Sequence, residues 1–77
     1  MTSKIELYDW RSVERIVGLT HRLGCAYTRL EVRAEDPAAA PRTRYKAEID
    51  FIGSPEALGR LSAQITRLLN DEREMAR

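Results

Sequence analysis

The sequence contains one cysteine and one histidine among its 77 residues, and aromatic residues make up only 6%. A single cysteine cannot form an intramolecular disulfide or a multi-cysteine metal site, so we expect a reducing compartment. Neither sign of charge dominates, because 13 Lys and Arg residues balance 12 Asp and Glu residues. The resulting net charge of +1 argues against nucleic acid or a membrane as the partner.

Long hydrophobic runs are also absent. No apolar stretch approaches the roughly 20 residues that span a membrane, and the opening segment Met1 to Glu6 lacks the apolar run of a signal peptide. We therefore expect a cytoplasmic protein with no membrane partner. The length suffices for one small domain with one thin core.

Motifs that carry catalysis or hold cofactors do not occur either. The sequence has no GxGxxG pattern, Walker-type loop, HExxH or CxxC. Cys25 and His21 lie on opposite sides of an expected helix end, whereas a nucleophilic cysteine needs a base beside it. We interpret Cys25 as a small, partly buried hydrophobic residue. No catalytic residue, metal site or cofactor is expected.

What the sequence does contain is alternation of apolar and polar residues in three segments, which predicts three strands. They cover residues 4–8, a run from residue 26 to 33, and a run from residue 44 to 51. Two prolines in residues 35–42 predict an exposed connection between the second and third strands. The side chains expected to face the core are those of Ile5, Leu7, Ala26, Thr28, Leu30, Val32, Tyr45, Ala47, Ile49 and Phe51.

Two other segments show the spacing of amphipathic helices. The first runs from about Trp10 to Leu23, with Asp9 as its N-cap and Gly24 as the left-handed residue that ends it. The second begins at Ser54-Pro55-Glu56, where serine caps, proline takes the first position and glutamate favours the helix dipole. Its apolar stripe stops near Leu69, so residues 71–77 are expected to form a polar tail that frays.

These elements predict an α+β fold with the order strand–helix–strand–strand–helix. Both helices are expected on one face of an antiparallel sheet with the order 1-3-2, because a right-handed crossover places the first strand beside the third. This two-layer arrangement is ferredoxin-like, with the usual final strand missing or irregular. Residues 1–70 would form the single domain.

A sheet without its final strand has two unpaired edges, and unpaired edges attract partners. The second strand carries Tyr27, Arg29, Glu31 and Arg33 on its expected open face. Alternating charges would let two copies pair antiparallel along this strand. We therefore expect a homodimer, also because so small a core is marginal by itself.

Two further interpretations stay open from the residues. Trp10 either covers the end of the core or contacts a ligand or partner. An RNA-binding domain would have the same order of elements and would stack bases on Tyr8 and Tyr27. Acidic residues alternate with the basic ones on that face, which makes nucleic acid the weaker interpretation.

The run Val13-Glu14-Arg15-Ile16-Val17-Gly18-Leu19-Thr20-His21-Arg22-Leu23-Gly24 resembles the first helix of the ACT domain in small regulatory subunits of acetolactate synthase. In that family a Val-Gly-Leu run leads through a glycine into the second strand. The segment from Gly53 to Leu58 and the segment from Ser62 to Leu69 are similar to the second helix of the same domain. The resemblance covers about residues 4–70 and implies an ACT-like fold.

The resemblance also implies a function. It implies a non-catalytic subunit that forms a dimer and binds the thiamine-diphosphate-dependent catalytic subunit in branched-chain amino-acid synthesis. An amino-acid effector would bind around the first helix, at Tyr8, Asp9, Trp10, Arg11, Ser12, Val13, Gly24, Cys25 and Ala26. Arg11 and Ala26 stand where many members have glycine and asparagine, so a ferredoxin-like dimerisation module without an amino-acid ligand stays open as an alternative.

Overall fold

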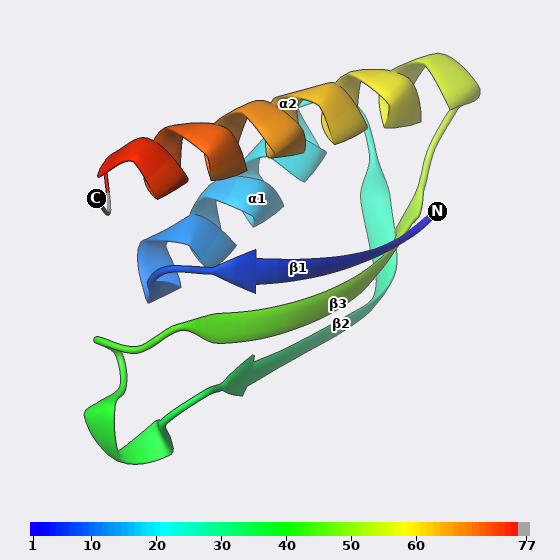
Figure 1. Ribbon diagram of the computed structural model, residues 1–77. Helices are drawn as coiled ribbons and strands as arrows, with labels where there is room; N and C mark the ends of the chain where they lie inside the picture. Colours follow the sequence, from blue (N-terminus) through cyan, green and yellow to red (C-terminus); the bar gives the residue numbers. More distant parts are fainter. Residues whose placement is uncertain (76–77) are drawn as a thin grey trace.

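The computed structural model describes residues 1–75, in which a three-stranded sheet carries two α-helices (Figure 1). The elements are β1 (Thr2–Leu7), α1 (Trp10–Arg22), β2 (Ala26–Ala34), a short 3₁₀ helix η1 (Pro37–Ala39), β3 (Tyr45–Ile52) and α2 (Pro55–Met75). Strand β3 lies in the centre and pairs antiparallel with both β1 and β2. The predicted α+β class, element order and strand order are therefore confirmed.

The core lies between the sheet and the helices, which cover the same side of the strands (Figure 1). Alternation along β1 and β3 directs every second side chain toward the helices, and one stripe of each helix meets them. The buried apolar side chains are those of Ile5, Leu7, Val13, Ile16, Tyr45, Ala47, Ile49, Phe51, Leu61 and Ile65.

Helix α1 begins at Trp10, as the sequence predicts, and ends at Arg22, so that Leu23, the predicted last residue, is its C-cap. The Asp9 carboxylate accepts a hydrogen bond from the Ser12 backbone N–H at 3.1 Å, which satisfies one free amide of the first turn. At the other end, Gly24 has a φ of 75°, a conformation that a side chain would strain. The chain therefore turns directly from α1 into β2.

Strand β2 departs from simple alternation near its start. Its register with β3 shifts between Tyr27 and Arg29, so Thr28 is the extra residue of a β-bulge. Tyr27 consequently pairs with Phe51, which faces the helices, whereas Arg29 pairs with Asp50 on the open face. The expectation that Tyr27 shares the open face with Arg29, Glu31 and Arg33 is wrong. Ala26 and Thr28, which were expected to face the core, are exposed instead.

Helix α2 is longer than predicted. It continues through Met75, which corrects the expectation of a frayed tail from residue 71; residues 76 and 77 lie outside the described residues. Glu72 explains the extra turn, because it lies seven residues after buried Ile65 and its side chain contacts Ser12 of α1. A polar residue thus extends the buried stripe of α2 beyond Leu69, where the apolar pattern stops.

Candidate functional site

The predicted effector residues form two groups at opposite ends of α1. Residues 8–13 lie around its N-terminus, and residues 24–26 follow its C-terminus. The 13 residues of α1 extend over about 20 Å, at 1.5 Å per residue. A single copy of the chain therefore does not bring the two groups together.

The N-terminal group contains a hydrogen-bonded cluster between α1 and α2. The buried Ser12 hydroxyl lies 3.3 Å from the Asp9 carboxylate and also donates to Oε1 of Glu72. Arg15 adds an ion pair, with its Nη1 3.8 Å from the same Glu72 oxygen. Sequence reasoning missed Glu72, although its position on the α2 stripe was a signal that could have identified it.

A cleft of about 250 Å³ opens beside this cluster. Its lining combines two acidic and two basic side chains with a tyrosine and a methionine, namely Asp9, Glu72, Arg11, Arg15, Tyr8 and Met75. The Glu72 side chain is only 11% exposed, and its Oε2 is buried without a hydrogen-bond partner. Glu72 therefore brings to the lining an unpartnered acceptor that is closed to solvent, and two basic side chains line the same cleft.

Val13 and Trp10 of the N-terminal group serve the core, and Ser12 is buried as well. Val13 and Ser12 are buried, so neither presents a free surface to a ligand. The Trp10 ring packs edge-on against the buried Tyr45 ring, with the centroids 5.5 Å apart, while 44% of Trp10 stays exposed. The interpretation of Trp10 as a cover over the end of the core is thus supported, and its outer surface remains accessible.

The C-terminal group is also partly structural. Cys25 is half-buried and packs against the core, as predicted. Its Sγ lies so near Gly53 that a Cβ at position 53 would be 3.0 Å away. Ala26, at the start of β2, pairs with Ile52, at the end of β3, and both residues are exposed.

The open face of the sheet carries an ion-pair network around Arg29. This guanidinium lies 2.8 Å from Asp50, 3.2 Å from Glu48 and 3.1 Å from Glu31. Cross-strand ion pairs therefore join β2 to β3 around Arg29.

The network also shifts the pKa of two of its members, Asp50 and Arg29. Hydrogen bonds from Arg29, and then from the Thr2 hydroxyl at 2.6 Å, lower the pKa of Asp50. The same contacts, with Asp50 first and Glu48 second, raise the pKa of Arg29. Both groups stay charged, so Arg29 is committed to partners within its own chain.

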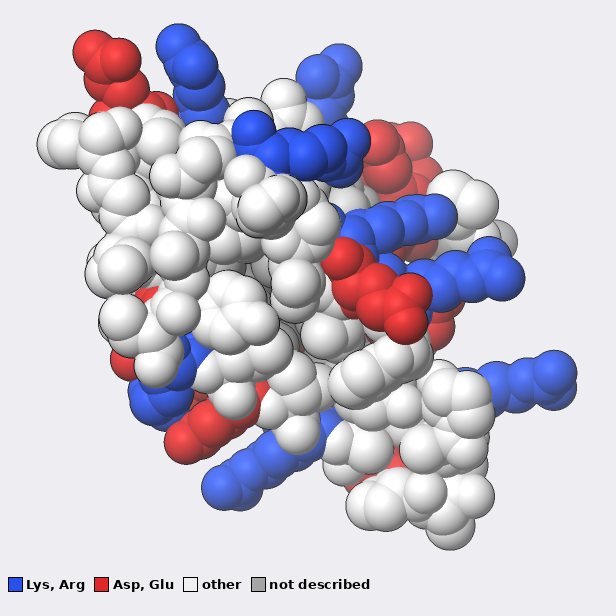
Figure 2. All heavy atoms as spheres, turned by 180° about the vertical axis from the view of Figure 1, so that it is seen from behind, with Lys and Arg blue, Asp and Glu red and all other residues white. Residues whose placement is uncertain are grey.

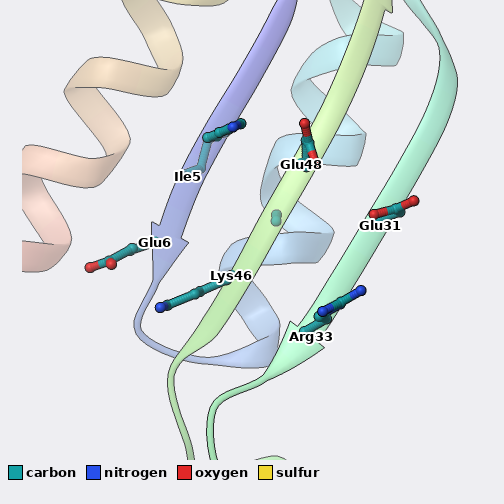
Figure 3. A pocket seen from close by; sticks show the side chains of 8 residues that line it. Ile5, Glu6, Glu31, Arg33, Lys46 and Glu48 are labelled. Carbon is teal, nitrogen blue, oxygen red and sulfur yellow. The ribbon is translucent and has the colours of Figure 1, made fainter.

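A shallow hollow of about 480 Å³ lies on the same face (Figure 3). It is lined by Lys4, Ile5, Glu6, Glu31, Arg33, Lys46, Ala47 and Glu48. Basic and acidic side chains alternate across it, so it provides no surface of one sign for a phosphate backbone. In Figure 3 the Glu6 side chain extends past β1, away from β3, while Lys46 points toward β1.

Seen from behind, residues other than Lys, Arg, Asp and Glu make up a broad area that reaches the left margin of the view, and charged residues lie mainly at the top, the right and the lower left (Figure 2). Large hydrophobic side chains with substantial exposure elsewhere in the chain include Tyr27 at 43% and Ile52 at 51%. They belong to adjacent pairs in the register of β2 with β3.

Comparisons with protein-family models, with curated proteins and with solved structures find no significant match to this chain. Among residues 1–75, no three His, Cys, Asp or Glu side chains are grouped so that they could hold a metal ion. Neither helix in this part is long and apolar enough to cross a bilayer. The likeness to ACT domains accordingly rests on the sequence motifs alone.

Proposed function

We propose that this chain is a non-catalytic, ACT-like regulatory or stabilising subunit, and that its partner is a thiamine-diphosphate enzyme of the acetolactate synthase type in the cytoplasm. The observation that carries the proposal is the order β1, α1, β2, β3 and α2 around a three-stranded sheet in residues 1–75, which is the order expected of an ACT-like domain without its final strand. Two unpaired strand edges suit a small subunit that works by binding other chains.

An amino-acid effector would bind in the cleft beside the N-terminus of α1. Its ammonium group would pair with the acidic side chains that line the cleft, Asp9 and Glu72, and its carboxylate would pair with Arg11 or Arg15. A zwitterion matches a cleft that holds both signs of charge. The residues around Cys25 would come from a second copy, since they lie at the far end of α1.

A dimerisation module of the same shape, without an amino-acid ligand, is the second candidate. The separation of the two groups by the length of α1 favours it, as does the burial of Ser12 and Val13. In this version the Ser12–Glu72 contact only holds the end of α2 against α1.

Two measurements separate these functions. Co-expression with an acetolactate synthase catalytic subunit, followed by affinity capture, is expected to recover both chains; failure to recover the enzyme would contradict the subunit proposal. Thermal unfolding with branched-chain amino acids tests the effector. A ligand at about 100 times its Kd adds about 2.7 kcal/mol of stability.

The matched variants for the effector test are Arg15→Ala, in the cleft, and Arg22→Ala, later on the same helix and outside that cleft. Only Arg15→Ala is expected to reduce the thermal shift. The absence of a shift with any amino acid would remove the effector and leave the dimerisation module.

A further inference from the structure

Strand β1 has an unpaired edge that runs beside α2 (Figure 1). A groove of about 270 Å³ lies there, lined by residues 4–7 of β1 and by Tyr8, Arg44, Leu69 and Arg73. Its floor and wall include apolar Ile5, Leu7 and Leu69, while Lys4, Glu6 and Arg73 supply charge. The groove therefore lies along an unpaired strand edge and combines apolar with charged side chains, as a site that accepts an added strand requires.

The hydrogen bonds of β1 define which residues face this edge. The Phe51 N–H donates to the Met1 carbonyl at 2.7 Å, and the Met1 amino group donates back to the Phe51 carbonyl at 3.0 Å. Because such pairs alternate along antiparallel strands, Ser3, Ile5 and Leu7 direct their backbone groups to β3. Thr2, Lys4 and Glu6 direct theirs outward.

We propose that a second copy of this chain pairs antiparallel along β1, with a two-fold axis at Ile5. This register places Lys4 opposite Glu6 of the second copy, and Glu6 opposite its Lys4. Both residues have outward backbone groups, so the same pairs exchange the hydrogen bonds of the new ladder. Hydrogen bonding and charge thus select one register.

The neighbouring symmetric registers lack this match. An axis at Lys4 places two lysines opposite each other, and an axis at Glu6 does the same with two glutamates. Like charges directly opposite each other destabilise antiparallel pairs. With the axis at Ile5, the two isoleucines also meet on the helix side, below Leu69 of each copy.

The β2 edge, where the sequence predicts pairing, is less suited than the β1 edge to pairing with a second copy. Its charge match depends on Arg29, which already contacts Glu31, Glu48 and Asp50 of its own chain. The bulge at Thr28 also interrupts that strand, and bulges discourage pairing at an edge. Self-association through β1 deepens the proposed function and rests only on its claim that the chain assembles through a sheet edge.

The test uses two opposite charge reversals, Lys4→Glu and Glu6→Lys, with sedimentation equilibrium as the measurement. In either variant alone, two attractive cross-strand pairs become repulsive, so the dimer Kd is expected to rise about tenfold or more. An equimolar mixture of the two variants restores both attractive pairs. The mixture should therefore form a heterodimer about as tight as the wild-type dimer.

The matched control is Arg33→Glu, which reverses a charge on the same face at the β2 edge. It should leave the dimer Kd unchanged. Lys4 and Glu6 also lie opposite Glu48 and Lys46 of β3, so thermal unfolding must show that each single variant folds. If the two variants associate only when they are mixed, misfolding cannot explain the weak association of each variant alone, because the mixture contains the same two chains.

The inference is overturned if wild type is monomeric, if both single variants associate as tightly as wild type, or if Arg33→Glu is the variant that weakens the dimer. Capture of the catalytic subunit is measured on the same samples. If the chain is a monomer that still captures the enzyme, the proposed function stands and self-association through β1 is wrong. The same conclusion holds if Lys4→Glu abolishes capture by that monomer. A β1 dimer that captures no enzyme does the reverse.

Discussion

Arg29 lies on the open face of the sheet with 39% of its side chain exposed, in contact with three carboxylates from β2 and β3. Single exposed ion pairs contribute little to stability, because water and salt screen them and two long side chains must be held in place. A shared guanidinium that bridges two strands orders several groups at once. Because Glu48 and Asp50 belong to β3, the network connects β2 to β3 directly after the bulge.

The pH dependence of Asp50→Asn tests this network. The folded-state pKa of Asp50 is lowered, so its contribution is present above the ordinary aspartate pKa of about 3.9 and disappears as the pH falls through the folded-state value. The variant should therefore unfold at a lower temperature than wild type near neutral pH, and the difference should shrink in acid. High salt should reduce it as well. A difference that does not change with pH would assign the effect to packing instead.

Glu72 combines a buried, unpartnered oxygen with one hydrogen bond to Ser12. Replacing a buried charge by an apolar side chain of similar volume is often neutral or stabilising, and Ser12 keeps Asp9 as its partner. Glu72→Leu should consequently unfold in urea at the same concentration as wild type or higher. Glu74→Leu, at an exposed position in the same turn, is the control. A loss of more than about 2 kcal/mol would contradict this view of Glu72.

At the scale of the elements, two glycines make opposite predictions. Gly24 has a positive φ, so Gly24→Ala should cost about 1 kcal/mol. Gly59 lies within α2 with open space where a Cβ would stand, so Gly59→Ala should stabilise by about 0.5–1 kcal/mol. Urea denaturation of both variants measures the difference. Shifts in the same direction would mean that Gly24 does not need its left-handed conformation to end α1.

Most elements could be predicted from the sequence because their signals are local. Asp9, Gly24 and the Ser54-Pro55 pair act within a turn of the helix ends that they define. The bulge at Thr28 could not be predicted, since the alternation of β2 reads without interruption and only the pairing with β3 shifts it. Tyr27 changed face for that reason.

The candidate site was less accessible to sequence reasoning. The effector residues were chosen by likeness to a family, and α1 separates them in a single copy. Glu72 contacts Ser12 across 60 residues of chain, and no local pattern marks such a contact. Only its position on the α2 stripe connects it with the core, and a polar residue there resembles a helix end.

As a whole molecule, the chain leaves much of its surface exposed. Its accessible surface of 5500 Å² exceeds the about 4,800 Å² expected of a compact protein of this mass. The exposed surface includes one open face of the sheet and the free edges of β1 and β2. A subunit that assembles with other chains would cover part of this surface.

Amide hydrogen exchange resolved by residue tests this assembly most directly, because it reports the backbone edges without any substitution. The N–H groups of Lys4 and Glu6 point away from β3, and by the same alternation those of Leu30 and Val32 point away from β3 at the β2 edge. Raising the protein concentration should slow exchange at Lys4 and Glu6 while Leu30 and Val32 stay fast. Fast exchange at Lys4 and Glu6 at every concentration, or slowing at Leu30 and Val32 instead, would contradict the account.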